Sequence, residues 1–438
     1  MISFNRIFKN NFVKNVLNVS FFTILAQVVG VISLPIITRI YSPSDFGLYS
    51  FFVTVMSISG LLATGKFDSA ILVSDNKTKR KNLMKIILLI SICASFCFLV
   101  LFFIIDLFNL ETFQLENKYE LLSLALLSII FYANTASFTF WHNTKSRYTL
   151  LGIGQLLRAS SAAVIKISLG VLATITGAGL IYGYVASQAI LLILLFTIFF
   201  INDLQKNNLI PKKEDLLQHI SSLKETIKEY KDFPKFALPT DFISHVSSQA
   251  PILLTGPIFG GTTLGFFALA RTILGLPTQI LGSAVRTVFQ REAAKEFNKN
   301  GTCKKVFLNT FFILSGAALI PCIITILYAE PLFIFIFGAE WEMAGTYCEI
   351  LAPLFFIRMV SKPLNFMFHL SGHLKFDLQL MNIFLIFSAI SFFIGWHYDS
   401  AIIAFSLISA LHSIGYLIYL FFSYRFASGF RLSSYKKT

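Results

Sequence analysis

Residues Ile86–Ile105 read IILLISICASFCFLVLFFII, a run of twenty residues without a charged side chain. An α-helix needs about 20 consecutive apolar residues to cross the hydrocarbon core of a bilayer. The whole chain follows this pattern: 55% of its 438 residues are hydrophobic, only 13% are charged, and the mean hydropathy is +0.72. A soluble domain carries about 25% charged residues. The composition therefore predicts a polytopic membrane protein.

Further apolar runs of similar length recur along the chain and predict an all-α fold of about twelve transmembrane helices. We place them at residues 17–38, 46–65, 84–105, 120–141, 152–174, 178–201, 236–257, 264–288, 306–328, 347–369, 376–396 and 400–424.

Basic residues gather in every second connection between these runs, and the net charge is +14. An example is the connection after the second span, with Lys77, Lys79, Arg80 and Lys81. Nucleic acid is not the expected partner, because these residues are spread over short loops rather than over one folded face. By the positive-inside rule, both termini are predicted to be cytoplasmic.

The chain is predicted to divide into two halves. Residues 1–201 and 236–438 would each form a six-helix bundle, and residues 202–235 would form a cytoplasmic amphipathic linker. A plain linker and a docking site for a biosynthetic partner are both open for that segment. Phe46–Ser50 (FGLYS) and Leu264–Ala268 (LGFFA) are weakly similar and open corresponding spans. Six spans per half predict parallel bundles related by a pseudo-two-fold axis along the membrane normal.

Six basic residues lie within predicted spans, without an acidic set of similar size. They are Arg158, Lys166, Arg271, Arg286, Arg358 and Lys362. A charge at the bilayer centre costs about 3 kcal/mol, so six exposed to lipid would cost on the order of 15–20 kcal/mol. We therefore expect them to face protein or water. They predict a cavity with positive walls that binds an anionic substrate.

Snorkelling to the membrane surface is the alternative explanation for cations near helix ends. It applies best to Arg158, Arg286 and Lys362. The aqueous surface is too far for easy reach from Lys166, Arg271 and Arg358, so these three form the core of the predicted anion path.

Acidic and polar groups share one face of the predicted span at 236–257. Asp241, His245 and Gln249 follow one another at intervals of four residues. Within a membrane they could relay protons and act in coupling or gating. Alternatively, Asp241 simply pairs with a buried cation such as Arg286, which lies at a similar predicted depth.

Signatures of enzymes are absent from the sequence. There is no glycine-rich phosphate loop, no metal-ligand spacing and no nucleophile constellation. We therefore expect a transporter without a bound cofactor or metal. Its energy could come from the membrane potential or from coupling to protons or sodium ions.

Several motifs resemble those of polysaccharide repeat-unit flippases of the Wzx type. They are Tyr230–Pro239 (YKDFPKFALP), Ala250–Ile252 (API), Gly265–Arg271 (GFFALAR), Phe337–Trp341 (FGAEW) and Tyr41–Tyr49 (YSPSDFGLY). That family belongs to the superfamily of the multidrug and toxic-compound extruders and the lipid II flippases.

The resemblance implies two six-helix bundles that rock around a central cavity open to one side at a time. It implies that an undecaprenyl-diphosphate-linked oligosaccharide moves from the cytoplasmic to the periplasmic leaflet of a bacterial inner (cytoplasmic) membrane, for assembly of lipopolysaccharide O-antigen or capsule. Membrane lipids, a polysaccharide polymerase and a chain-length regulator are the implied partners. A diphosphate suits arginine and lysine side chains, which form charge-assisted hydrogen bonds with phosphate oxygens.

Two other functions stay open. A membrane-embedded glycan polymerase or ligase handles the same lipid but would carry a larger periplasmic loop than any predicted here. A cation or drug exporter of the same fold would need an acidic cavity, whereas the predicted cavity is basic.

Overall fold

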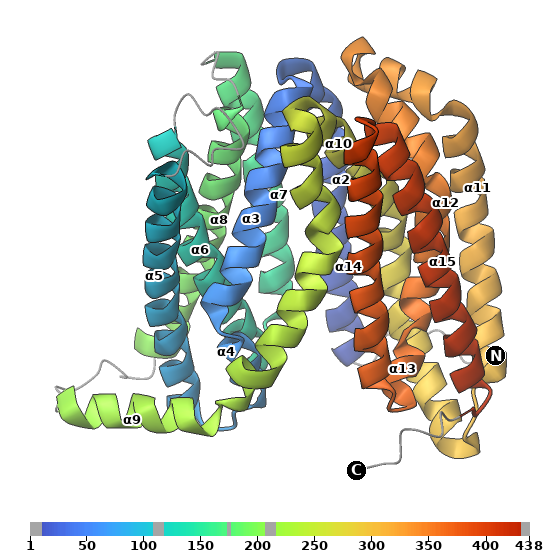
Figure 1. Cartoon of the computed structure of the whole chain (residues 1–438). Helices are drawn as coiled ribbons and strands as arrows, with labels where there is room; N and C mark the ends of the chain where they lie inside the picture. The colour runs from blue at the N-terminus through green and yellow to red at the C-terminus, as the bar shows by residue number, and fades with distance from the viewer. Residues whose placement is uncertain (1–10, 108–117, 173–176, 206–215, 431–438) are drawn as a thin grey trace. The chain divides into compact units, whose positions relative to one another are not determined.

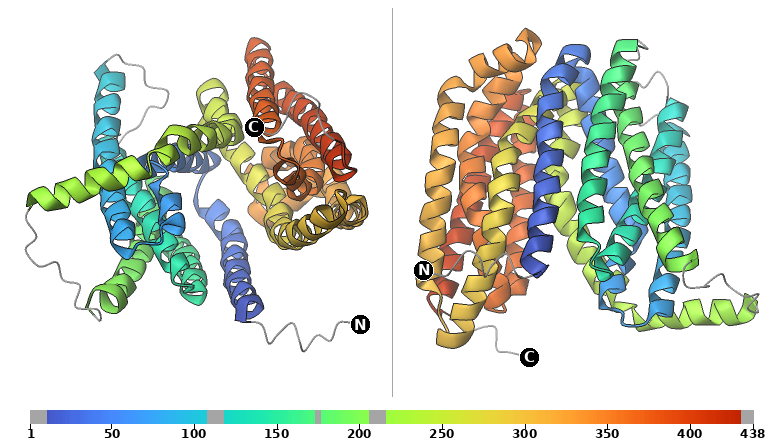
Figure 2. Two further views of the ribbon diagram at one scale, coloured as in Figure 1. Left: turned by 90° about the horizontal axis from the view of Figure 1, so that it is seen from below. Right: turned by 180° about the vertical axis from the view of Figure 1, so that it is seen from behind.

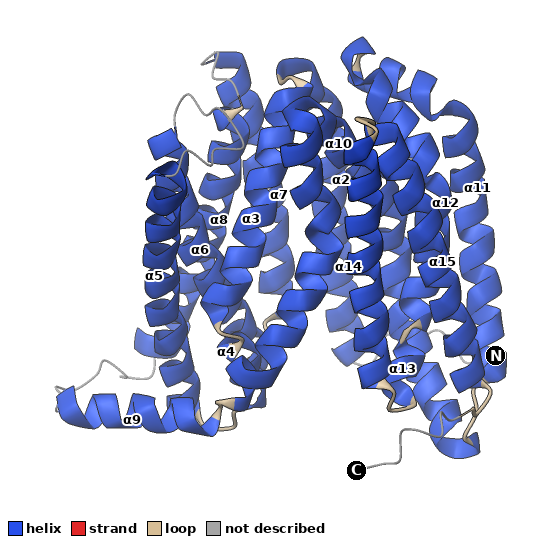
Figure 3. Cartoon of the chain, viewed as in Figure 1, coloured by secondary structure: helices blue, strands red, loops and turns tan. Residues whose placement is uncertain are grey.

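The structure, a computed structural model, describes residues 11–107, 118–172, 177–205 and 216–430. These residues form helices joined by short turns, and no strand occurs among them (Figure 3). Eleven helices are long and apolar enough to cross a membrane. The predicted all-α, multi-pass fold is therefore confirmed.

Contacts divide the chain into two compact units. The first unit comprises Met1–Tyr41 and Phe51–Phe242, and the second comprises Ser42–Ser50 and Ile243–Thr438. The predicted division into residues 1–201, 202–235 and 236–438 differs from this in three respects. Ser42–Ser50 belongs with the second unit, whereas the described part of the predicted linker and residues 236–242 belong with the first.

The first unit is built around long antiparallel helices. Its elements are α2 (Asn11–Ile40), most of α3 (Pro43–Thr64), α4 (Phe67–Val73), α5 (Lys77–Leu107), α6 (Lys118–Thr144), α7 (Tyr148–Leu172), α8 (Ala178–Phe199), η1 (Phe200–Gln205), α9 (Leu216–Glu229) and η2 (Phe233–Ala237). Helix α7 packs between α2 and α8, while the short α4 packs against α5 and α6. Helix α9 runs across the ends of the spans of this unit rather than along them (Figures 1 and 2).

The second unit contains the rest of the chain. Its elements are the start of α3, most of α10 (Leu238–Asn300), α11 (Lys304–Phe337), η3 (Ala339–Trp341), α12 (Glu342–Leu364), α13 (Phe366–Leu370), α14 (Leu374–His397) and α15 (Ala401–Ala427). Helix α12 packs against α11 and α15, and α15 also packs against α14. These contacts bury an aromatic core that includes Phe289, Phe307, Phe368, Tyr419 and Phe426.

Helix α10 is two helices separated by a break. Its apolar part, together with η2, spans 47 residues, which as one straight helix would be about 70 Å long, more than twice the bilayer core. The break lies at Gly260, where φ is 87° and ψ is 169°. This conformation is easily reached only by glycine. Counted as two spans, α10 brings the described spans to the twelve that the hydropathy predicts.

The two segments that resemble each other in the sequence meet in the second unit. A Cβ atom added to Gly47 would collide with the carbonyl oxygen of Gly261, and one added to Gly265 would collide with that of Pro43. Both glycines therefore permit a close approach of α3 and α10 that a larger residue would prevent. This approach explains why Ser42–Ser50 groups with the second unit.

A buried tryptophan joins three of the motifs that resemble the flippase family. The Trp341 side chain is 0% exposed, and its ring lies edge-on to those of Phe46, 5.7 Å away, and Phe266, 6.0 Å away. Such aromatic pairs add about 0.5–1.5 kcal/mol beyond the area they bury. These motif residues therefore hold the fold together rather than line the cavity described below.

The first turn of α3 is fixed by a reciprocal cap. The backbone N–H of Asp45 donates to Ser42 Oγ at 3.2 Å, and the Ser42 hydroxyl donates to Asp45 Oδ2 at 2.8 Å. Such a cap satisfies N–H groups that a helix start leaves unpaired. It fixes where α3 begins, just before the glycine contact at Gly47.

Candidate functional site

A cationic cavity lies within the second unit. Its volume is about 140 Å³, enough for several waters or a small anion. The cavity lies between α10 and α12, and its lining residues are Arg271, Gly275, Thr278, Gln279, Phe355, Arg358 and Lys362. They recur at helical spacing on each helix, so each helix turns one polar stripe toward the cavity. No acidic side chain is among these lining residues.

One of the two terminal nitrogens of the Arg271 guanidinium is held by hydrogen bonds. Its Nη2 donates to the carbonyl oxygen of Ser248 at 2.9 Å and to Gln249 Oε1 at 2.8 Å. Its Nη1 is buried and has no hydrogen-bond partner in the described part of the chain. A buried guanidinium donor without a partner is costly. The arrangement therefore leaves one strong donor available to an anion.

Arg358 and Lys362 come from the same face of α12. The Arg358 guanidinium lies over the Phe355 ring, 5.4 Å from its centroid. A cation–π contact of this kind restrains the side chain without neutralising its charge. Three cations around one small cavity repel one another, and the lining contains no carboxylate to offset them. A bound anion would relieve this repulsion.

The remaining predicted cations do not line this cavity. Arg286 is an exposed residue of α10. Arg158 and Lys166 lie two turns apart on α7 in the first unit, and both are partly buried. The Arg158 Nε atom is buried without a partner among the described residues. The Lys166 side chain packs closely on Gly183 of α8, where a Cβ atom would collide with it. Substrate contact by these three residues stays a prediction.

Asp241 pairs with a cation, as the alternative explanation expected, but the partner is not the suggested Arg286. Asp241 Oδ2 instead lies 2.6 Å from the ammonium of Lys66, in the turn between α3 and α4. The suggestion of Arg286 compared only the expected depths of the two residues in the membrane. The backbone of Gly65 and Lys66 is left-handed, and this turn places Lys66 beside the first turn of α10. The residues predicted to share one face also have different partners, because Gln249 accepts a hydrogen bond from Arg271, whereas Asp241 pairs with Lys66. Coupling or gating by Asp241, His245 and Gln249 stays a prediction.

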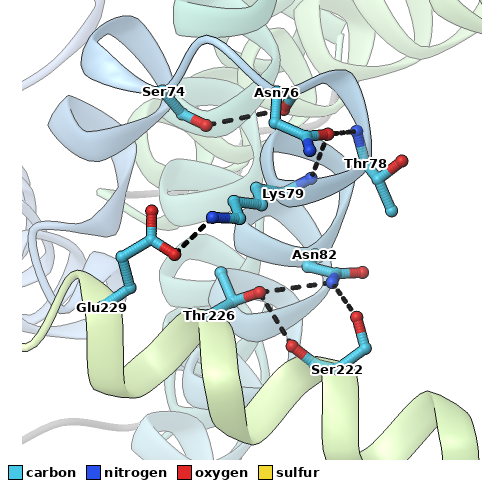
Figure 4. Close-up of polar contacts among 8 residues, drawn as sticks. All are labelled: Ser74, Asn76, Thr78, Lys79, Asn82, Ser222, Thr226 and Glu229. Atoms are coloured by element: carbon cyan, nitrogen blue, oxygen red, sulfur yellow. Dashed lines mark hydrogen bonds and ion pairs between the residues drawn. The ribbon is translucent and has the colours of Figure 1, made fainter.

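Helix α9 is fastened to α5 by polar contacts (Figure 4). Asn82 Nδ2 donates to Ser222 Oγ at 2.8 Å and to Thr226 Oγ1 at 3.3 Å. Lys79 pairs with Glu229 at 2.5 Å. Thr226 is 2% exposed, so this face of α9 is buried against the unit. The helical spacing predicts the helix, but not that its polar residues make the contact.

A buried network was also missed by the sequence analysis. Asp203 Oδ2 accepts from Arg147 Nη1 at 2.7 Å and from Trp141 Nε1 at 3.2 Å. Arg147 also contacts His142 Nδ1 at 3.1 Å, and His142 Nε2 lies 3.0 Å from the carbonyl oxygen of Leu195. The network ties the turn between α6 and α7 to the end of α8. Its role is structural, because every member is engaged with another part of the unit.

Comparison with known proteins identifies the family. The family model described as "Polysaccharide biosynthesis protein" matches residues 36–346, which is more than two thirds of the chain. The chain belongs to this polysaccharide biosynthesis protein family. Its predicted resemblance to polysaccharide flippases is thereby confirmed at the level of the family.

One curated relative is the teichuronic acid biosynthesis protein TuaB of Bacillus subtilis (strain 168). It is 25% identical over 138 residues, which are 31% of this chain and 28% of the relative. The chain thus matches little more than a quarter of that protein's length.

Solved structures share the fold over nearly the whole chain. The lipid II flippase MurJ in an inward closed conformation has a TM-score of 0.69 and 16% identity, over 92% of this chain and 87% of MurJ. An inward-facing multidrug resistance transporter of the MATE family and MOP superfamily has a TM-score of 0.61 and 16% identity, over 92% and 94%. A MOP superfamily transporter from Pyrococcus furiosus has a TM-score of 0.61 and 13% identity, over 95% and 96%. These likenesses establish the fold, which the chain shares with these three proteins over nearly its whole length.

Proposed function

We propose that this protein flips an undecaprenyl-diphosphate-linked oligosaccharide from the cytoplasmic to the periplasmic leaflet of a bacterial inner membrane. The proposal joins membership of the polysaccharide biosynthesis family to a fold shared with a lipid II flippase. The oligosaccharide would be a repeat unit of a surface polysaccharide such as O-antigen or capsule. Transport by alternating access and cytoplasmic termini belong to the same proposal.

The cationic cavity is the observation that carries this proposal. Arg271, Arg358 and Lys362 surround a space of about 140 Å³, and none of the described residues that line it is a carboxylate. The space suits a diphosphate, whose oxygens accept charge-assisted hydrogen bonds from arginine and lysine. It is too small for an oligosaccharide, so in this conformation it would hold only the linking diphosphate. The same charges would repel the cationic substrate of a drug exporter.

The energy for transport would come in part from the membrane potential. A diphosphate carries about two negative charges, and the inside of a bacterial membrane is negative. Outward movement is therefore favourable by about 2.3 kcal/mol per charge for each 100 mV. Flipping in proteoliposomes that persists unchanged after the potential alone is collapsed would contradict this contribution. A polysaccharide polymerase and a chain-length regulator would act on the product.

A complementation experiment tests the proposed function. A strain of the source organism that lacks the gene should accumulate the lipid-linked oligosaccharide on the cytoplasmic side and lose its surface polysaccharide. The wild-type gene should restore the polysaccharide, whereas Arg271→Ala and Arg358→Ala should not, with normal amounts of protein in the membrane. Arg291→Ala is the matched control, because Arg291 is exposed on the same helix as Arg271. Single repeat units displayed outside the deletion strain would indicate a polymerase instead.

A further inference from the structure

A buried carboxyl group in the first unit has no assigned role. Asp68 lies in the first turn of α4 and is 6% exposed. Its Oδ1 atom is buried and has no hydrogen-bond partner among the described residues. A buried carboxylate oxygen without a donor is unfavourable, whereas a protonated carboxyl group carries no net charge. The position therefore favours a bound proton.

Charged groups around Asp68 do not neutralise it. Lys66 precedes it by two residues but gives its ammonium to Asp241 at 2.6 Å. Tyr132 of α6 interacts electrostatically with Asp68, and Arg158 of α7 acts on the same tyrosine. On the other elements that pack against α4, Arg80 donates to Ser74 at 2.6 Å and Lys235 lies over the Phe236 ring.

Burial raises the pKa of Asp68 above its usual range. Smaller opposing effects come from the charge of Lys66, from the backbone N–H groups of Ser69 and Asp68, and from the Thr64 side chain. The folded protein therefore binds this proton more tightly than the unfolded chain does. Its stabilising effect is full at low pH and is lost as the pH rises through the raised pKa. The buried Oδ1 atom without a donor likewise favours the protonated carboxyl group.

Lys66 connects this carboxyl group to α10. Its φ is 59°, a left-handed value that a lysine rarely adopts, and it follows Gly65 with a φ of 55°. The Lys66 N–H is held by Thr64 Oγ1 at 3.0 Å. The pair with Asp241 forms one residue before Phe242, where the first unit ends along α10. Lys66 is thus fixed between two carboxyl groups at the point where the chain enters the second unit.

We propose that Asp68 is a proton-binding site whose charge controls how firmly Lys66 holds Asp241. A proton from water forms an O–H bond on Asp68 and changes its charge from −1 to zero. Lys66 is then fully available to Asp241, and the first turn of α10 is held to the unit. Loss of the proton restores a second carboxylate that competes for Lys66 and loosens the hold. A role of this switch in transport rests on the proposed function, but proton binding does not.

Infrared spectroscopy of the purified protein tests proton binding. The wild type should show the C=O stretch of a protonated carboxyl group that disappears as the pH is raised, and Asp68→Asn should lack this band. Asp377→Asn is the matched control, because Asp377 is also buried but accepts a hydrogen bond from Tyr419 at 2.7 Å. Asp377, also buried, can give a band of its own, so a titrating band that is unchanged between the wild type and Asp68→Asn, or no such band in the wild type, would overturn the proposal. Asp68→Glu should keep a titrating band if the asparagine variant fails to fold.

Hydrogen exchange of residues 238–245 tests the link to α10. After correction for intrinsic exchange, the wild type should exchange up to about fivefold faster once Asp68 is ionised, since an ion pair this exposed is worth little. Asp68→Asn should exchange slowly at every pH and Lys66→Met rapidly at every pH. Equal pH dependence in the wild type and Asp68→Asn would overturn the switch. Neither readout requires transport, so failure of the proposed function would be seen separately as an absence of flipping.

Discussion

Replacement of Arg271 by alanine should weaken diphosphate binding strongly. The Nη1 atom of Arg271 has no partner among the residues that the structure describes, while Nη2 donates to Ser248 and Gln249. A diphosphate in the cavity would gain one charge-assisted hydrogen bond from Nη1, worth about 1.5–3 kcal/mol. Its loss corresponds to about 10- to 150-fold weaker binding.

Arg271→Lys separates charge from geometry. A lysine keeps the positive charge but has a single ammonium in place of the planar fork of the guanidinium. It cannot hold Ser248 and Gln249 while also reaching into the cavity. We therefore expect about tenfold weaker binding, between the wild type and Arg271→Ala.

Calorimetric titration of the detergent-solubilised protein with inorganic diphosphate measures both effects. The salt concentration must be fixed, because screening weakens every charge contact. Arg291→Ala, exposed on the same helix, should bind as the wild type does. If Arg271→Ala bound diphosphate within twofold of the wild type, the cavity would not be the anion site, and the reasoning from the free donor would be refuted.

Three further changes probe the packing that supports the site. Asp203→Asn should lower the free energy of unfolding by about 3 kcal/mol, because it leaves the Arg147 guanidinium without its carboxylate; an unchanged thermal transition would argue against this. Gly265→Ala should lower the free energy of unfolding by about 1–3 kcal/mol, because the added Cβ atom would collide with a backbone carbonyl. Gly316→Ala is the control in the same thermal assay and should not destabilise the protein, because its Cβ atom would meet open space. Asn82→Ala should weaken the contact between α9 and α5 by about 1–2 kcal/mol. Unchanged hydrogen exchange in α9 would show that this contact is dispensable.

The spans could be predicted because the bilayer imposes their length and composition. Twenty apolar residues in sequence have few alternatives to a transmembrane helix. Even the long helix α10 agrees, since Gly260 divides it between the predicted spans. The cations Arg271 and Arg358 could be recognised for a related reason, because the cost of burying a charge leaves them only protein or water to face. Lys362 also lines the cavity, although its position in the sequence favours snorkelling, whereas Lys166, expected in the core of the anion path, does not.

The partners of the charged residues could not be predicted in the same way. Predicted membrane depth suggested Arg286 for Asp241, but the choice of Lys66 depends on a left-handed turn that brings two distant segments together. Asp203 finds Arg147 only once α8 has packed beside α6. Asp68 lies in a short segment between spans, and its neighbours along the chain do not indicate that its side chain is buried.

The division of the chain shows the same limit. Hydropathy places a boundary at the polar segment near residue 202, because polarity marks a connection outside the membrane. The buried contact of α9 through Asn82 and Thr226 instead makes that segment part of the first unit. The contact of Gly47 with Gly261 assigns the start of α3 to the second unit. Such assignments follow from close approach in space, which composition does not reveal.

Reconstituted flipping tests the central claim most directly. Purified protein in proteoliposomes is given an undecaprenyl-diphosphate-linked oligosaccharide, and its transfer between leaflets is followed by a membrane-impermeant enzyme or lectin. We predict transfer by the wild type and by Arg291→Ala, and its loss in Arg271→Ala and Arg358→Ala. Absence of transfer by the wild type under an inside-negative potential, or full transfer by both cavity variants, would contradict the account.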